Sequence, residues 1–131
     1  MTEEIMRERE RHARSIPTDE DFAKAHTAMD RRLRIFAEVR DSVFEMLPDA
    51  PLHELYLFGE PGEEVFARVF FETESDIQVC NKCGVSKHVH DAILKGFQKR
   101  EDSLNTTLTT EYDSHENVQK KCNGDYFKYL K

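Results

Sequence analysis

Long hydrophobic runs are absent from this chain of 131 residues. No apolar stretch approaches the roughly 18 residues that a membrane-spanning helix needs. The stretch from Met1 to Glu4 also lacks the basic and then apolar pattern of a secretory signal peptide. The three cysteines are an odd number, which argues against a framework of disulfide bonds. Together these absences predict a cytoplasmic protein.

Positively charged residues are fewer than negatively charged ones. The 19 Lys and Arg residues are outnumbered by 26 Asp and Glu residues, which gives a formal net charge of −7. An acidic surface disfavours nucleic-acid phosphates and anionic membranes as partners and favours a basic protein. Apolar residues make up only 38% of the chain, but they recur periodically, so a folded domain is still expected. The length suits one domain, which we place at residues 18–131, after a charged helical arm at residues 1–17.

Signatures of catalysis are absent as well. The sequence contains no Gly-rich phosphate loop and no nucleophile elbow. Its six histidines are scattered, most of them among polar neighbours. We therefore predict a protein that is not an enzyme. A small hydrolase or transferase, whose reactive groups would meet only in the folded chain, ranks lowest among the function classes.

A long amphipathic helix is predicted to open the domain, from Thr18 to Leu47. Thr18 can cap this helix, and the acidic residues that follow suit the positive end of the helix dipole. Pro48 ends it. Phe36 lies in the middle of the apolar stripe and is predicted to be buried against a sheet. The stripe consists of Phe22, Ala25, Met29, Leu33, Phe36, Val39, Val43 and Leu47.

A β-hairpin is predicted from two runs of β-branched and aromatic residues, Leu55–Phe58 and Val65–Phe71, on either side of a turn with Gly and Pro. Phe66 and Phe70 share one face of the second run, so either both faces of the sheet are partly covered or these rings are exposed. The predicted fold is α+β, an antiparallel sheet of four to five strands packed against two helices. The other expected elements are strands at Ile77–Val79, Leu104–Tyr112 and Val118–Cys122, a second helix at Ser86–Asp102, and docked aromatic residues at 125–130.

Cys80 and Cys83, with a glycine after the second, form the sharpest local motif. Such a knuckle can present two thiolates to one zinc ion. A helix that begins at Lys87 would turn the two nearest histidines to roughly opposite sides, and no second Cys-x-x-Cys completes the site. We therefore predict no bound metal and keep a zinc-knuckle adaptor as the alternative function. The further ligands of such a site would be His88 or His90, with Cys122 or His53 as the fourth.

Three short segments show a resemblance to a known family. They are Leu55–Glu60, Val85–Lys87 with the helix that follows, and Tyr126–Leu130. In this order they resemble the small immunity proteins of bacterial toxin–immunity systems, and the YezG-like antitoxin family among them. The chain departs from that family in having no tryptophan. The resemblance implies a non-enzymatic inhibitor that blocks a cognate toxin by covering its active surface.

The predicted partner-binding surface lies at the tip of the hairpin. Glu60, Glu63 and Glu64 concentrate negative charge there, and Tyr56 and Phe66 can stand beside them as aromatic anchors. Charged turns are also common because they are well solvated, and that interpretation stays open. Two other surfaces are candidates for the contact: the acidic group Glu72, Glu74 and Asp76, and the aromatic group Tyr126, Phe127 and Tyr129.

Overall fold

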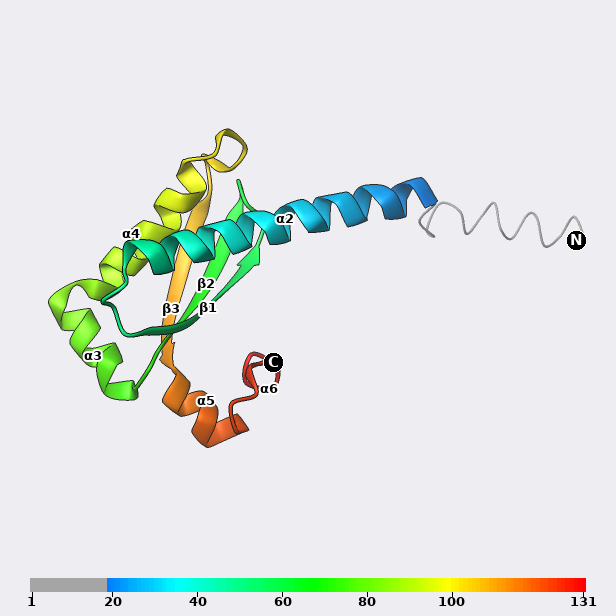
Figure 1. Ribbon diagram of the computed structural model, residues 1–131. Coiled ribbons are helices and arrows are strands. Elements are labelled where there is room, and N and C mark those ends of the chain that lie inside the picture. Colours follow the sequence, from blue (N-terminus) through cyan, green and yellow to red (C-terminus); the bar gives the residue numbers. More distant parts are fainter. Residues whose placement is uncertain (1–18) are drawn as a thin grey trace, which may run out of the picture. The chain divides into compact units, whose positions relative to one another are not determined.

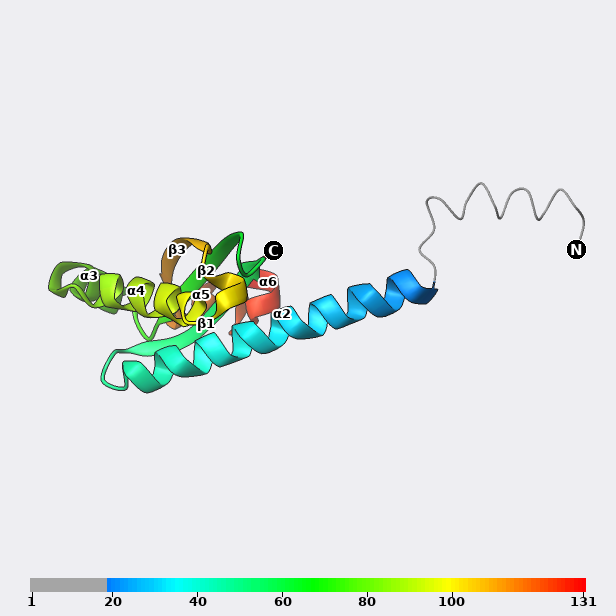
Figure 2. The ribbon, with the colours of Figure 1, turned by 90° about the horizontal axis from the view of Figure 1, so that it is seen from above.

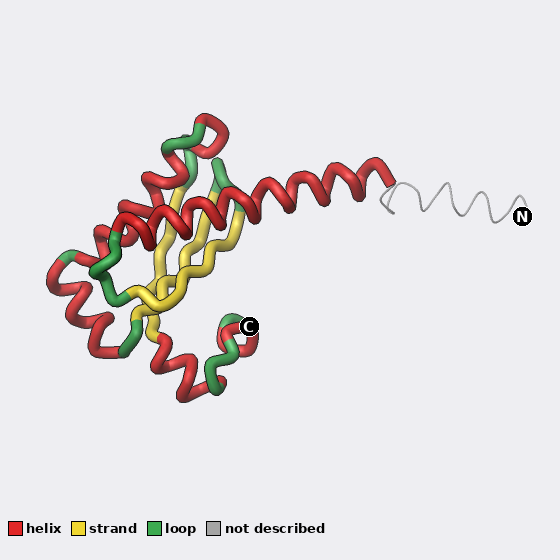
Figure 3. Tube along the Cα trace, in the orientation of Figure 1, coloured by secondary structure: helices red, strands yellow, loops and turns green. Residues whose placement is uncertain are grey.

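The computed structural model describes residues 19–131, so the predicted arm at residues 1–17 lies outside the described part. The chain divides into two units, Met1–Arg34 and Ile35–Lys131. In the first unit, residues 19–34 are helical and belong to α2 (Asp19–Met46), whose bounds agree closely with the predicted helix. The second unit contains the end of α2 and every other described element (Figures 1 and 3).

A mixed three-stranded sheet forms the centre of the second unit. Its strands are β1 (Leu52–Gly59), β2 (Glu64–Phe71) and β3 (Thr107–Ser114). Strand β2 lies in the middle, antiparallel to β1 and parallel to β3. The predicted hairpin is therefore confirmed. The predicted antiparallel sheet of four to five strands is wrong for the described residues, although the α+β class holds.

The predicted strand at Ile77–Val79 is instead part of helix α3 (Glu74–Cys83). A capping box begins this helix. The hydroxyl of Thr73 accepts a hydrogen bond from the amide of Asp76 at 3.3 Å, and the carboxylate of Asp76 accepts one from the amide of Thr73 at 3.1 Å. These reciprocal bonds satisfy two backbone donors at the start of the helix and outweigh the β propensity of a short apolar run.

The predicted edge strand at Val118–Cys122 is the end of helix α5 (His115–Cys122), which α6 (Tyr126–Tyr129) follows. Ser114 caps α5, because its hydroxyl accepts a hydrogen bond from the amide of Asn117 at 3.1 Å. With a helix in place of the expected strand, β3 pairs with β2 alone among the described strands.

The parallel pairing of β2 and β3 follows from the long connection between them. Helices α3 and α4 (Val85–Gln98) and the 3₁₀ helix η1 (Glu101–Ser103) return the chain to the starting end of β2. The predicted helix Ser86–Asp102 is wrong at its end, because α4 ends at Gln98 and η1 follows it. Gly84, with a φ of 87°, separates α3 from α4.

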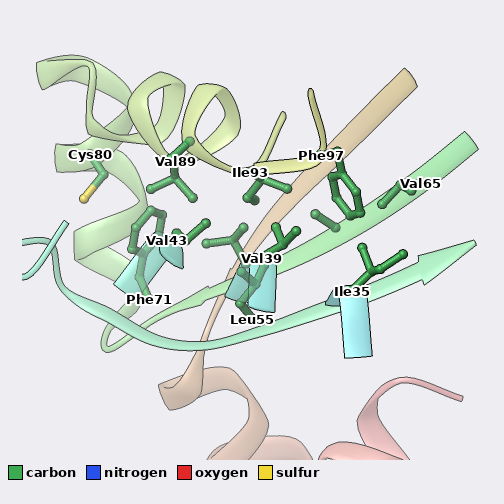
Figure 4. Packing of buried hydrophobic residues seen from close by; sticks show 13 residues of the cluster. Ile35, Val39, Val43, Leu55, Val65, Phe71, Cys80, Val89, Ile93 and Phe97 are labelled. Atoms are coloured by element: carbon green, nitrogen blue, oxygen red, sulfur yellow. The ribbon is translucent and has the colours of Figure 1, made fainter. Parts of the chain in front are cut away.

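The main core lies between one face of the sheet and helices α2 and α4 (Figure 4). Phe71 of β2 and Phe97 of α4 are both fully buried there. Phe36, which was predicted to be buried, is only partly buried and packs edge-on against Phe97, with ring centroids 6.0 Å apart. In the predicted stripe, Met29 and Leu33 are 46% and 55% exposed. The row of α2 that faces the sheet consists of Ile35, Val39 and Val43.

Candidate functional site

The second face of the sheet, opposite the main core, is only partly covered. Strand alternation places Phe66, Arg68 and Phe70 of β2 on this face. Phe58 of β1 pairs directly with Phe66 and belongs to the same face. Phe58 is 44% exposed and Phe66 is 47% exposed. They form an aromatic pair that is open to solvent.

The C-terminal helices cover the other end of this face (Figures 1 and 2). The ring centroids of Tyr126 and Tyr129 in α6 lie 5.0 Å and 6.0 Å from that of Phe70. Phe70 is fully buried, whereas Phe66 remains exposed, so one of the two rings is covered and the other is not. The predicted docking of the C-terminal aromatic residues is confirmed for the two tyrosines, but Phe127 is 88% exposed.

A stack of two histidines fixes the C-terminal helices to the sheet. The rings of His53 in β1 and His115 in α5 lie 3.7 Å apart between centroids. Nδ1 of His115 is 2.7 Å from the hydroxyl of Tyr126, and Nδ1 of His53 is 3.0 Å from Oε2 of Glu72. Both histidines are therefore engaged in holding the cover over Phe70.

Asp113, near the end of β3, links the C-terminus to the strands. It accepts hydrogen bonds from the hydroxyl of Tyr129 and, at 2.9 Å, from the side-chain amide of Asn117. Nη2 of Arg68 lies 3.5 Å from its Oδ2. Burial alone would raise the pKa of Asp113, but the hydrogen bonds and the charge of Arg68 hold that pKa below its usual value. Asp113 therefore stays ionised at neutral pH.

The docked tyrosines predict a loss of stability in alkali. Burial raises the pKa of Tyr126 and Tyr129 from 10.0 to about 12. The folded chain therefore holds these protons more tightly than the unfolded chain. The stabilisation is fully present below pH 10.0 and is lost as the pH rises toward about 12. Urea unfolding at a series of pH values should show the free energy of unfolding falling across this window.

A double variant checks the origin of that loss. With Tyr126→Phe and Tyr129→Phe there are no phenols left to ionise at α6, so the decline of stability with pH should be shallower than in the unchanged chain. Equal slopes for the two proteins would show that these tyrosines do not set the alkaline response.

A hollow of about 270 Å³ lies beside the exposed aromatic pair. Nε of Arg68 has no hydrogen-bond partner among the described residues and lies 3.5 Å from Oε2 of Glu111. The side chain of Glu111 is 68% exposed, so the ion pair of Glu111 with Arg68 borders the hollow. The lining consists of Phe58, Phe66, Ala67, Arg68, Thr109, Glu111 and Leu130.

The acidic tip of the hairpin borders the same face. Glu60, Glu63 and Glu64 are all exposed. Glu64 precedes Phe66 by two residues in β2 and therefore points to the same side of the sheet. The amide of Glu60 donates a hydrogen bond to the backbone oxygen of Glu64 at 2.9 Å, which closes the turn. The structure thus brings the predicted acidic residues next to one predicted anchor, Phe66.

Tyr56, the other predicted anchor, lies at the covered end of the face. Its ring centroid is 6.1 Å from that of Phe70 and 5.4 Å from that of Tyr126. Phe58 and Leu130 line the hollow instead, and neither was predicted from the sequence. Phe58 could have been found from the hairpin register, because it stands next to the turn. Leu130 gave no comparable signal, since its position depends on how the C-terminus docks.

The predicted metal ligands are spread over four elements: the two cysteines of the motif lie in α3, the two nearest histidines in α4, Cys122 in α5 and His53 in β1. Cys80 is buried in the core and Cys83 is exposed, both near the end of α3. His88 is exposed, and Nδ1 of His90 is 2.7 Å from Oγ1 of Thr110. Within residues 19–131, no three His, Cys, Asp or Glu side chains are placed to hold a metal ion. The cysteines thus lie in a helix and not in a knuckle turn, and the absence of a cofactor remains a prediction.

No family model matches this chain, and neither does any curated protein or solved structure. The resemblance to small immunity proteins therefore remains a prediction. Each helix in the described part of the chain is too short or too polar to cross a bilayer.

Proposed function

We propose that this chain is a protein-binding domain without catalytic activity, and that it holds a basic partner against the uncovered end of the second sheet face. The exposed pair of Phe58 and Phe66 beside the hollow is the observation on which this proposal rests. We call this surface the open face. It comprises Phe58, Glu64, Phe66, Arg68, Thr109, Glu111 and Leu130.

The open face combines an apolar centre with a charged border. Aromatic side chains that are exposed next to each other are typical of surfaces that contact another molecule. Glu111 lines the same hollow as the two rings, and Glu64 precedes Phe66 by two residues on the same side of β2. Both glutamates are exposed. A Lys or Arg of the partner can lay its aliphatic stem on the rings and place its charge near a carboxylate. The net charge of −7 also favours the approach of a basic protein.

Among non-enzymatic binding proteins, a cytoplasmic inhibitor of the immunity or antitoxin kind fits these features best. Such an inhibitor neutralises its partner by covering it, which requires an adhesive face and opposite charge but no reactive groups. The alternative, a zinc-knuckle adaptor, has less support, because Cys80 is buried in the main core.

Replacing Phe66 by Ser should weaken partner binding at least about tenfold, because ring contacts at the centre of an interface supply much of its affinity. The fold should survive, since this side chain is already 47% exposed. The partner is first captured on the unchanged chain from cells of the source and identified. The purified partner is then titrated against both proteins by calorimetry.

Phe127→Ser is the matched comparison and also tests the other aromatic candidate surface at α6, because Phe127 is 88% exposed and does not line the hollow. Its affinity should equal that of the unchanged chain. The triple Gln variant of Glu60, Glu63 and Glu64 should slow association at low salt and have little effect at higher salt. If Phe66→Ser binds as tightly as the unchanged chain, the open face is not the binding surface.

A further inference from the structure

Among the described strands, β3 forms one edge of the sheet and pairs with β2 alone. The amide of Thr107 donates to the backbone oxygen of Glu63 at 2.8 Å, so the backbone groups of Thr107 point toward β2. The backbone groups of successive residues in a strand point to alternate sides. Those of Leu108, Thr110 and Tyr112 therefore point away from β2, and no described residue forms a backbone hydrogen bond with them there.

Strand β3 has few of the features that normally protect an edge strand, which are charged side chains (above all Lys), Pro and β-bulges. It contains no Lys, Arg or Pro, and its register with β2 runs without a bulge. Its two acidic residues, Glu111 and Asp113, pair with Arg68 of β2. At the opposite edge, β1 has a register shift between Leu52 and Glu54, and a carboxylate oxygen of Glu54 accepts a hydrogen bond from the amide of Leu55. Strand β3 is therefore the edge better suited to accept a further strand.

We propose that an extended basic segment of the partner pairs with β3 as a fourth strand, an inference that rests on the proposed function. Neighbouring strands lie about 4.8 Å apart, so every second side chain of this segment would lie beside Thr109 and Glu111 on the open face. A Lys or Arg at such a position would reach the carboxylate of Glu111, which pairs with Arg68 at 3.5 Å but whose side chain is 68% exposed. Backbone hydrogen bonds then supply affinity, and the alternate side chains supply selectivity.

A second copy of this chain is a poorer occupant of the edge. Each copy carries a net charge of −7. Pairing two β3 strands would also bring the two Glu111 side chains onto one narrow ribbon, and like charges that face each other across strands destabilise a sheet. A basic segment meets the same carboxylates with the opposite charge, and for this reason we assign the edge to a partner.

Amide hydrogen exchange of the full chain, measured by NMR, tests the assignment. The probe is a short capped peptide in which Lys alternates with Val and Phe. Binding as a fourth strand should slow exchange at the amides of Leu108, Thr110 and Tyr112 at least about tenfold. The amides of Thr109 and Glu111 already point toward β2 and should change little.

Two control peptides carry the same side chains. In one, the amides of the odd-numbered residues are N-methylated, and in the other, those of the even-numbered residues. N-methylation of alternate amides removes the N–H donors from one edge of the peptide strand and puts methyl groups in their place, so that this edge can no longer pair with β3. One peptide should therefore lose binding, and the other should keep it. Docking through side chains alone would treat the two peptides alike, which would overturn the inference.

The other outcomes separate this inference from the proposed function. If the peptide shifts the resonances of Phe58 and Phe66 but leaves the edge amides unprotected, strand addition is wrong and the proposed function stands. Strand addition is equally wrong if the peptide does not bind while Phe66→Ser still weakens binding of the captured partner. If the peptide does not bind and Phe66→Ser leaves binding of the captured partner unchanged, both proposals fail. If light scattering shows the free chain to be a dimer with protected edge amides, a second copy occupies β3.

Discussion

The variant Phe97→Ala is expected to lose about 3–5 kcal/mol of unfolding free energy. Phe97 lies on α4 and is fully buried between this helix and the sheet, where Phe36 of α2 meets its ring edge-on. Removal of the ring deletes its contacts with the sheet and with Phe36, and it leaves a cavity that a rigid sheet cannot close. Urea denaturation followed by circular dichroism measures the loss.

Two further alanine variants calibrate this result. Phe127→Ala removes a ring that is 88% exposed and should change stability by less than about 0.5 kcal/mol. Phe36→Ala should fall between the two, because Phe36 is partly buried. A loss below about 1 kcal/mol for Phe97→Ala would mean that α4 does not pack on the sheet as described.

The sequence predicts those parts of the fold in which local pattern and tertiary packing agree. Helix α2 has a continuous apolar periodicity and a proline just beyond its end, and the β1–β2 hairpin has two β-prone runs around a glycine turn. Helix α3 was missed because Ile77–Val79 resembles a strand when the capping box at Thr73 and Asp76 is ignored. The parallel pairing of β2 and β3 leaves no local pattern, because it depends on where two helices return the chain.

The candidate site was predictable to the extent that it follows the hairpin register. Phe66 and the acidic tip stand where the alternation of β2 places them. Which end of the face is covered could not be predicted, because the cover is made by contacts between Phe70 and α6, which are distant in sequence. Tyr56 of β1 contacts that cover through Tyr126, and Leu130 lines the hollow as a result of the docking of α6.

Substitution of Gly59 by Ala is expected to cost about 3 kcal/mol of unfolding free energy. Gly59 ends β1 with a φ of 99°, a left-handed conformation that costs about 1–2 kcal/mol for a residue with a side chain. A Cβ at this position would also overlap the backbone oxygen of Glu64, the atom that accepts the amide of Glu60. Because a backbone atom cannot rotate away, the overlap adds about 1–3 kcal/mol. Urea denaturation again gives the value.

Gly84→Ala is the matched control for this effect. Gly84 has a similar φ of 87°, but a Cβ there would meet no atom within 4 Å, so only the conformational term of about 1–2 kcal/mol applies. Equal losses for the two variants would contradict the close approach at the hairpin. The two glycine variants also separate an effect on stability from an effect on binding. Gly59 directly follows Phe58, which pairs with Phe66 across the hairpin. Under conditions in which both variants are folded, Gly59→Ala should weaken partner binding, whereas Gly84→Ala, at the junction of α3 and α4, should leave the affinity unchanged.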